Sequence, residues 1–125
     1  MGSTKYKEWQ YFLLSIRAES DVDHIDEVTW KQAVSNALRK SHGLFGEQIE
    51  LYWLKIDNKR AIIKCGFADK DILKTALATY ISSTELIGSP LVITMEQEAS
   101  QLNNLFLPED DKLWFNKIVE IENGD

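Results

Sequence analysis

The chain has 125 residues and a mass of 14.4 kDa, which suits a single domain with an ordinary hydrophobic core. Its formal net charge of -6 argues against an autonomous nucleic-acid-binding protein, since such proteins are usually basic. One cysteine excludes an internal disulfide, and no apolar run reaches the roughly 18–20 residues of a membrane-spanning helix. We expect one domain over residues 1–125, with flexible ends at residues 1–4 and 123–125.

The first predicted strand, residues 5–17, is apolar on both of its faces. Side chains alternate between the two faces of a strand with a period of two. One face here carries Trp9, Tyr11 and Leu13, and the other carries Phe12, Leu14 and Ile16. Such a sheet needs cover on both sides. Because a short chain has enough helix to cover only one face well, the other face, or part of it, is a candidate docking surface for another macromolecule.

A helix is predicted over residues 29–41, after the acidic loop 18–28. Thr29 and Gln32 fit a capping box at its start. Apolar residues then repeat at helical spacing, which gives the helix one apolar stripe: Trp30, Ala33, Val34, Ala37 and Leu38.

Two further strands are predicted over residues 48–56 and 60–67. The short polar break Asp57-Asn58-Lys59 between them predicts a hairpin. Asp69 is placed to cap a second helix over residues 70–82.

The last part of the chain is predicted to hold a fourth strand, residues 91–97, and a helix over residues 108–122 that begins at a proline followed by three acidic residues. The order of elements predicts an α+β fold, the ferredoxin-like split βαββαβ sandwich. Its four-stranded antiparallel sheet would carry two helices on one face. The additional C-terminal helix either covers the second face or reaches a partner.

Large apolar side chains on the sheet and on the last helix are the candidates for a protein interface. Aromatic anchors tend to dominate the binding energy of interfaces, although each of these side chains could equally fill the core. The candidates are Trp9, Tyr11, Trp53, Leu113, Trp114 and Ile118.

A basic cluster surrounds the hairpin and consists of Lys55, Lys59, Arg60 and Lys64. It is a candidate for RNA-phosphate contacts, and the alternative is ordinary surface charge near a turn. RNA-binding domains with this strand order stack bases on aromatic residues of the third strand. The third strand here has aliphatic side chains at those positions, so we expect no base readout on this sheet. Trp9, Tyr11 and Trp53 are the alternative residues for base stacking, although we favour core or interface packing for them.

We identify no catalytic residue, metal site or cofactor motif. Cys65 follows the apolar alternation of its strand and is interpreted as a small buried residue. Glu96 and Glu98 are spaced to share one face of the last strand, where carboxylates keep a sheet edge soluble.

Several short strings, spread in order along nearly the whole chain, carry more information than the pattern. The strings are Glu8-Trp9-Gln10-Tyr11-Phe12, Thr29-Trp30-Lys31-Gln32, Gly43-Leu44-Phe45-Gly46-Glu47, Ala68-Asp69-Lys70-Asp71, Thr79-Tyr80-Ile81-Ser82, Glu85-Leu86-Ile87-Gly88-Ser89-Pro90-Leu91 and Asp110-Asp111-Lys112-Leu113-Trp114. Together they resemble the family of the eighth Pop protein, the small acidic subunit of budding-yeast nuclear ribonuclease P and ribonuclease MRP.

The resemblance implies a non-catalytic structural subunit in the nucleus and nucleolus, with no membrane contact. It would pair with a subunit of similar fold, the fifth Pop protein, and with other proteins of the particle, and it would meet the RNA component mainly indirectly. That RNA is the catalyst that removes 5′ leaders from precursor tRNA and cleaves precursor rRNA. The alternatives are an independent RNA-binding domain that uses the basic hairpin, and a small-molecule regulatory domain.

Overall fold

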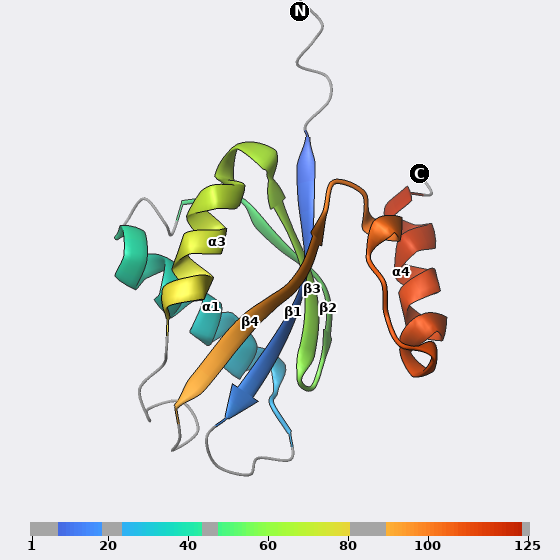
Figure 1. Ribbon diagram of the computed structural model, residues 1–125, viewed down its shortest axis with the longest axis horizontal. Helices are drawn as coiled ribbons and strands as arrows, with labels where there is room; N and C mark the ends of the chain where they lie inside the picture. The colour runs from blue at the N-terminus through green and yellow to red at the C-terminus, as the bar shows by residue number, and fades with distance from the viewer. Residues whose placement is uncertain (1–7, 19–23, 44–47, 81–89, 124–125) are drawn as a thin grey trace, which may run out of the picture.

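The computed structural model describes residues 8–18, 24–43, 48–80 and 90–123. Its centre is one antiparallel sheet with the strand order β2-β3-β1-β4. Two helices lie on one side of this sheet and a third lies on the other side (Figure 1). The strands are β1 (Trp9–Ala18), β2 (Leu51–Asp57), β3 (Arg60–Gly66) and β4 (Leu91–Ala99), and the helices are α1 (Glu27–His42), α3 (Lys70–Thr79) and α4 (Lys112–Asn123). This arrangement confirms the predicted ferredoxin-like sandwich.

The first helix begins two residues earlier than predicted. Asp26 is its N-cap, and the carboxylate of Asp26 accepts a hydrogen bond from the Thr29 backbone N–H at 2.8 Å. This bond lowers the pKa of Asp26 below its usual value. The predicted capping box with Thr29 as the cap is therefore wrong, because an aspartate three residues upstream takes that place. The Gln32 side chain instead donates to Asn36 Oδ1 along the helix.

The other predicted elements are present with shifted ends. Asp69 occupies the N-cap of α3, but its side chain makes no capping hydrogen bond because a 3₁₀ turn, η2 (Phe67–Asp69), leads directly into the helix. The last predicted helix begins later than residue 108, since the 3₁₀ turn η4 (Glu109–Asp111) precedes α4. Residues 5–7 of the first predicted strand, 19–23 of the acidic loop and 81–82 of the second predicted helix lie outside the described residues.

The main core lies between the sheet and the pair α1 and α3. Trp30 of α1 is its largest fully buried side chain, and the Trp30 ring meets that of Trp53 edge to face, with 6.2 Å between centroids. Cys65 is fully buried in this core, as predicted. The other core members include Phe12, Leu14, Ile16, Ala33, Val34, Ala37, Leu38, Ile63, Leu73, Ala76, Leu77, Leu91 and Ile93.

The β2–β3 hairpin is tied to the start of α1 through Asn58. This residue has a φ of 53°, a left-handed conformation that asparagine tolerates well. The Asn58 side-chain oxygen accepts the backbone N–H of Ile25 at 2.8 Å. The Asn58 carbonyl accepts the indole N–H of Trp30 at 2.5 Å. One turn residue thus satisfies two donors of another element.

Two variants of Asn58 separate the contribution of its left-handed backbone from that of its side-chain hydrogen bond. Asn58→Ala is expected to lower the free energy of unfolding by roughly 2–4 kcal/mol, because a left-handed alanine costs about 1–2 kcal/mol and the buried Ile25 N–H loses its acceptor. Asn58→Gly is expected to lower the free energy of unfolding only by the loss of the acceptor for the Ile25 N–H. Urea denaturation of both variants measures the difference, and equal losses would show that the backbone conformation stores no strain.

A β-bulge changes which face the two predicted edge carboxylates reach. The register of β1 against β4 shifts between Leu13 and Leu14, and Glu96 is the additional residue. The Glu96 carboxylate accepts the Ser15 hydroxyl at 2.6 Å. Glu98 instead contacts Lys74 of α3 at 2.7 Å and accepts the Gln10 amide at 2.7 Å. The prediction that Glu96 and Glu98 share one face is wrong, because the bulge breaks the strand alternation between them.

Candidate protein interface

The second face of the sheet is covered by the C-terminal part of the chain, residues 102–119. Three sheet side chains, Tyr11, Leu13 and Ile62, are buried against this segment. The side chains that cover them are Leu102, Leu105, Leu107 and Phe115. Both faces of the sheet are covered, as the apolar pattern of its strands predicts. The C-terminal part of the chain itself supplies the cover of the second face. Of the two alternatives predicted for the last helix, cover of the second face is the one found, so the part of this face under residues 102–119 is not a docking surface.

The segment before α4 is fixed to β4 by one side chain. The Gln97 amide nitrogen donates to the Phe106 carbonyl at 2.7 Å, and the Phe106 N–H donates to Gln97 Oε1 at 2.7 Å. This pair of bonds imitates the pairing of an additional strand. It places the Phe106 ring outward, where the ring is 76 % exposed.

The end of α4 is held over the sheet by a mostly buried ionic group. Glu122 forms an ion pair with Lys64 of β3 and accepts the Tyr11 hydroxyl at 3.1 Å. The Lys64 ammonium also lies over the Trp9 ring, 4.5 Å from the centroid. A charge that leaves water needs such a complete set of partners.

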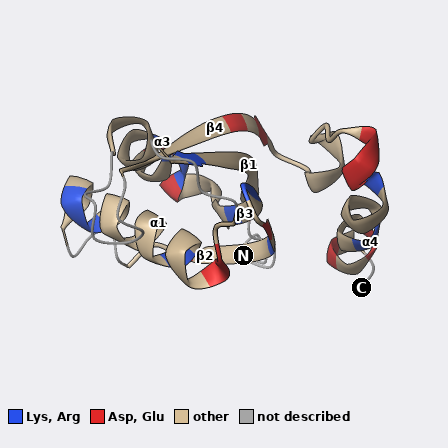
Figure 2. Cartoon of the chain, turned by 90° about the horizontal axis from the view of Figure 1, so that it is seen from below, with Lys and Arg blue, Asp and Glu red and all other residues tan. Residues whose placement is uncertain are grey.

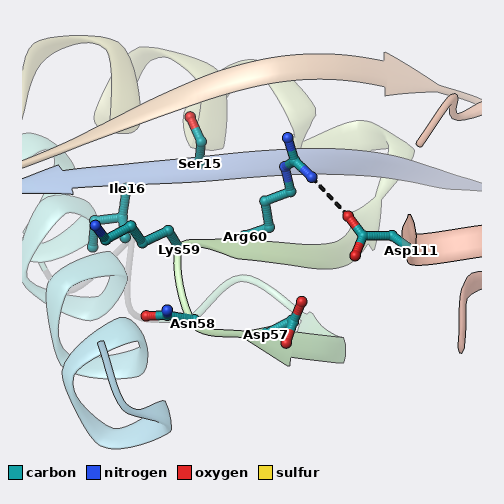
Figure 3. Close-up of a pocket in the computed structure, with 7 residues that line it drawn as sticks. All are labelled: Ser15, Ile16, Asp57, Asn58, Lys59, Arg60 and Asp111. Carbon is teal, nitrogen blue, oxygen red and sulfur yellow. Dashed lines mark hydrogen bonds and ion pairs between the residues drawn. The ribbon is translucent and has the colours of Figure 1, made fainter. Parts of the chain in front are cut away.

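A second ion pair joins the start of the C-terminal helix to the hairpin. The Arg60 guanidinium meets the Asp111 carboxylate at 2.7 Å, and both residues line a cavity of about 360 Å³ (Figure 3). The acidic residues of this part of the chain lie along α4 and the turn before it, as Figure 2 shows. The Lys55 ammonium lies 5.3 Å from the centroid of the Trp114 ring.

These contacts show which partners the four cations of the predicted RNA-phosphate cluster already have. Arg60 and Lys64 are paired with carboxylates of the C-terminal segment, Lys55 lies against an aromatic ring, and Lys59 is exposed at the turn. The four cations are therefore not one free basic surface. Direct phosphate contact by this cluster stays a prediction, and Arg60 and Lys64 are engaged in ion pairs within the chain.

The buried Tyr11 hydroxyl makes the stability of the folded protein vary with pH in the alkaline range. Burial, together with the charge and hydrogen bond of Glu122, raises the pKa of Tyr11 from 10.0 to about 12. Burial raises the pKa of the Cys65 thiol from 9.0 to about 12 as well. The folded protein thus holds protons that the unfolded chain loses above pH 9–10.

We therefore expect full stability below this range and a loss as the pH rises toward 12. The Tyr11 share is on the order of 3 kcal/mol, because its pKa rises from 10.0 to about 12. Tyr11→Phe should be less stable at neutral pH, because it loses the bond to Glu122, and should lose less stability between pH 10 and 12. Urea unfolding at a series of pH values measures this, and an unchanged alkaline slope would contradict it.

The predicted interface residues are divided between the two sides of the molecule. Tyr11 is 8 % exposed and belongs to the internal core under α4. Trp114 and Ile118 face the same core and are partly buried. Trp9 is partly buried at its edge, whereas Trp53 packs against the core on the opposite side of the sheet. Only Leu113, at 87 % exposed, presents its side chain fully to solvent.

The sequence reasoning missed two exposed apolar residues in the C-terminal segment that also carries Leu113. Phe106 and Ile121 are each 76 % exposed. Leu113 and Ile121 are eight residues apart, so they lie on one face of α4, away from the buried Phe115. Sorting the apolar positions of α4 by helical spacing would have separated this outward face from the inward one. We call Phe106, Leu113 and Ile121 the α4 outer patch.

Comparisons with known proteins match this chain over most or all of its length. The family model "Ribonucleases P/MRP protein subunit Pop8" matches residues 8–80. This chain belongs to the Pop8 family. The Ribonucleases P/MRP protein subunit POP8 of Saccharomyces cerevisiae is 46 % identical over 129 residues, which covers 100 % of this chain and 97 % of that protein. The predicted family resemblance is confirmed.

A solved structure extends the Pop8 match to three dimensions. A chain in the cryo-EM structure of yeast Ribonuclease MRP superposes with a TM-score of 0.77 and 44 % identity, and the match covers 96 % of this chain and 95 % of that chain. The Pop8 family model ends at the close of α3, but both full-length relatives also span the C-terminal cover. The cover is thus part of the region shared with the yeast proteins.

The described part of this Pop8-family chain holds no group of three or more His, Cys, Asp or Glu side chains placed to bind a metal ion. None of its described helices is both long and apolar enough to cross a membrane.

Proposed function

We propose that this chain is a non-catalytic protein subunit of ribonuclease P and ribonuclease MRP. The observation that carries the proposal is the match, over nearly the whole chain, to a chain of the yeast Ribonuclease MRP structure. The net charge of -6 supports assembly through protein contacts. So does the pairing of Arg60 and Lys64 with carboxylates of the same chain.

The proposed direct partner is the fifth Pop protein, the subunit of similar fold, together with other proteins of the particle. The RNA component carries the catalysis of precursor tRNA and precursor rRNA cleavage, and this chain meets it mainly indirectly, in the nucleus and nucleolus. The α4 outer patch supports a protein contact there, because three large apolar side chains of the C-terminal segment are exposed. Of the interface residues predicted from sequence, Leu113 remains the strongest, and Trp9, Trp53, Trp114 and Ile118 remain candidates at its margins or on other surfaces.

Co-expression with the fifth Pop protein tests this proposal. Size-exclusion chromatography with light scattering should show a stable one-to-one complex, formed without RNA. The chain expressed alone should self-associate, because its α4 outer patch is then uncovered. A monodisperse monomer that ignores this partner and binds RNA with a steep salt dependence would instead support an independent RNA-binding domain.

A further inference from the structure

The two hydrophobic cores of this chain are covered by different segments. The main core consists mainly of side chains from α1, α3 and one face of the sheet, and none of its described members comes from residues 102–123. The smaller core lies on the other face, where Leu102, Leu105, Leu107 and Phe115 supply the cover. Figure 1 shows α4 on the side of the sheet away from α1 and α3. Movement of residues 102–123 away from the sheet would therefore leave the main core in place.

The connection between β4 and this segment is short. It consists of Ser100 and Gln101, and both residues are exposed to solvent. Hinges are usually a few residues at the end of an element, where changes of backbone dihedral angles disturb no packed side chain. We call residues 102–123 the latch, and this connection is suited to act as its hinge.

Two ion pairs join the latch to the sheet, and both place the cation on β3 and the carboxylate on the latch. Arg60 meets Asp111 at 2.7 Å directly before α4, and Lys64 meets Glu122 near the end of that helix. The side chains of Asp111 and Glu122 are each only 17 % exposed. A carboxylate that has largely left water depends on its partners, so these pairs fix both ends of α4 to the sheet.

Apolar burial by itself holds the latch only weakly. Phe115 is the one buried residue of α4, all of whose residues the structure describes. Ordering the latch costs conformational entropy at every residue. Segments that bury few apolar side chains open locally while the rest of a protein stays folded. The balance between the closed and the open latch therefore depends on the two ion pairs.

We propose that the latch opens as one unit on the folded sheet, and that its two ion pairs with β3 keep it closed. Opening exposes Tyr11, Leu13 and Ile62 to solvent and separates both β3 cations from their carboxylates. This device is a property of the chain alone and goes beyond the proposed subunit role.

Native-state hydrogen exchange of the full chain, followed by NMR, tests the proposal at a concentration where light scattering shows a monomer. The Phe106 N–H, which donates to Gln97 Oε1, reports on the first part of the latch, and the Val119 N–H reports on α4. The N–H groups of Val34 and Ile63 report on the main core.

The two latch amides should exchange about 10-fold or more faster than the two core amides, after correction for intrinsic rates. Their exchange should also depend less on urea, because opening the latch exposes less surface than global unfolding does.

The double change Asp111→Asn with Glu122→Gln removes both latch charges and nearly preserves the side-chain shapes. It should accelerate exchange at Phe106 and Val119 by about 10-fold or more, because hydrogen bonds to charged groups are the stronger ones. Since the change destabilises only the closed state, the core amides should accelerate by the same factor. The ratio between the two classes of amide should stay constant.

Asp110→Asn with Glu120→Gln is the matched control. It removes the same two charges from the same segment, but both of these residues are exposed. Exchange at the latch amides should then change by no more than about twofold, because exposed charges contribute little to stability.

Three results would overturn the inference. The first is equal protection and equal urea dependence of latch and core amides in the unchanged chain, which would show that the latch opens only by global unfolding. The second is acceleration of Val119 without Phe106 in the charge variant, which would show fraying of α4 instead of movement of one unit. The third is equal acceleration by the control variant, which would assign the effect to net charge.

The measurement needs neither RNA nor the fifth Pop protein. A chain that forms the proposed complex can fail this test, and a chain that ignores that partner can pass it. Failure of the latch and failure of the subunit role therefore give different results.

Discussion

Replacing Trp30 by alanine is expected to lower the free energy of unfolding by about 3–5 kcal/mol, which is the usual cost of removing a large aromatic side chain from a core. Trp30 is fully buried between α1 and the sheet, in edge contact with Trp53. The change also removes the donor for the Asn58 carbonyl. Because a domain of this size has only about 5–15 kcal/mol of stability, a large part of the variant should be unfolded under mild conditions.

Urea denaturation followed by circular dichroism measures this loss. Trp30→Phe should lose less, because the ring stays and only the indole N–H bond and some volume are removed. Val28→Ala is the matched control on the same helix, since Val28 is 73 % exposed and its change should stay within about 0.5 kcal/mol. A Trp30→Ala variant as stable as the control would show that α1 does not pack on the sheet as described.

The double change Leu113→Glu with Ile121→Glu is expected to weaken association with the proposed partner, the fifth Pop protein, by about 100-fold or more. Both side chains point outward from α4, and charges placed at the centre of an apolar interface cost at least as much as the loss of a hot spot. Neither residue contributes to the core under the helix, so stability should change little. Co-purification and light scattering of the variant with its partner measure the effect.

Val28→Glu is the control for this experiment, because Val28 is an exposed valine on α1, on the other side of the sheet. It should form the complex as the unchanged chain does. If the double variant also forms the complex, the α4 outer patch is not the docking surface. Scanning Trp53 and the outer face of α1 would then be the next step.

Much of the fold follows from local patterns in this chain. Alternation with a period of two predicts the strands, and the stripe of Trp30, Val34 and Leu38 predicts α1, because each pattern reflects which side of one element is buried. Errors arose where one residue outside the pattern decides the outcome. The start of α1 depends on Asp26 as cap, and the faces of Glu96 and Glu98 depend on a single bulge.

The candidate site was less predictable, because residue type does not indicate which surface buries a side chain. Tyr11 and Trp114 are residue types that often anchor interfaces, yet both pack in the internal core between the sheet and α4. The members of the α4 outer patch are close in sequence, and only the packing of Phe115 against the sheet decides which face of α4 stays exposed.

The amino-acid sequence by itself determined the element order, the ferredoxin-like topology, the family and the need for cover on both faces of the sheet. These properties depend on short-range periodicity and on ordered short strings, which are visible without coordinates. Only the tertiary structure decided what the second cover is and which charges remain free. Glu122 meets Tyr11 across 111 positions and Lys64 across 58, and such long-range pairs form through folding of the whole chain rather than through any local pattern.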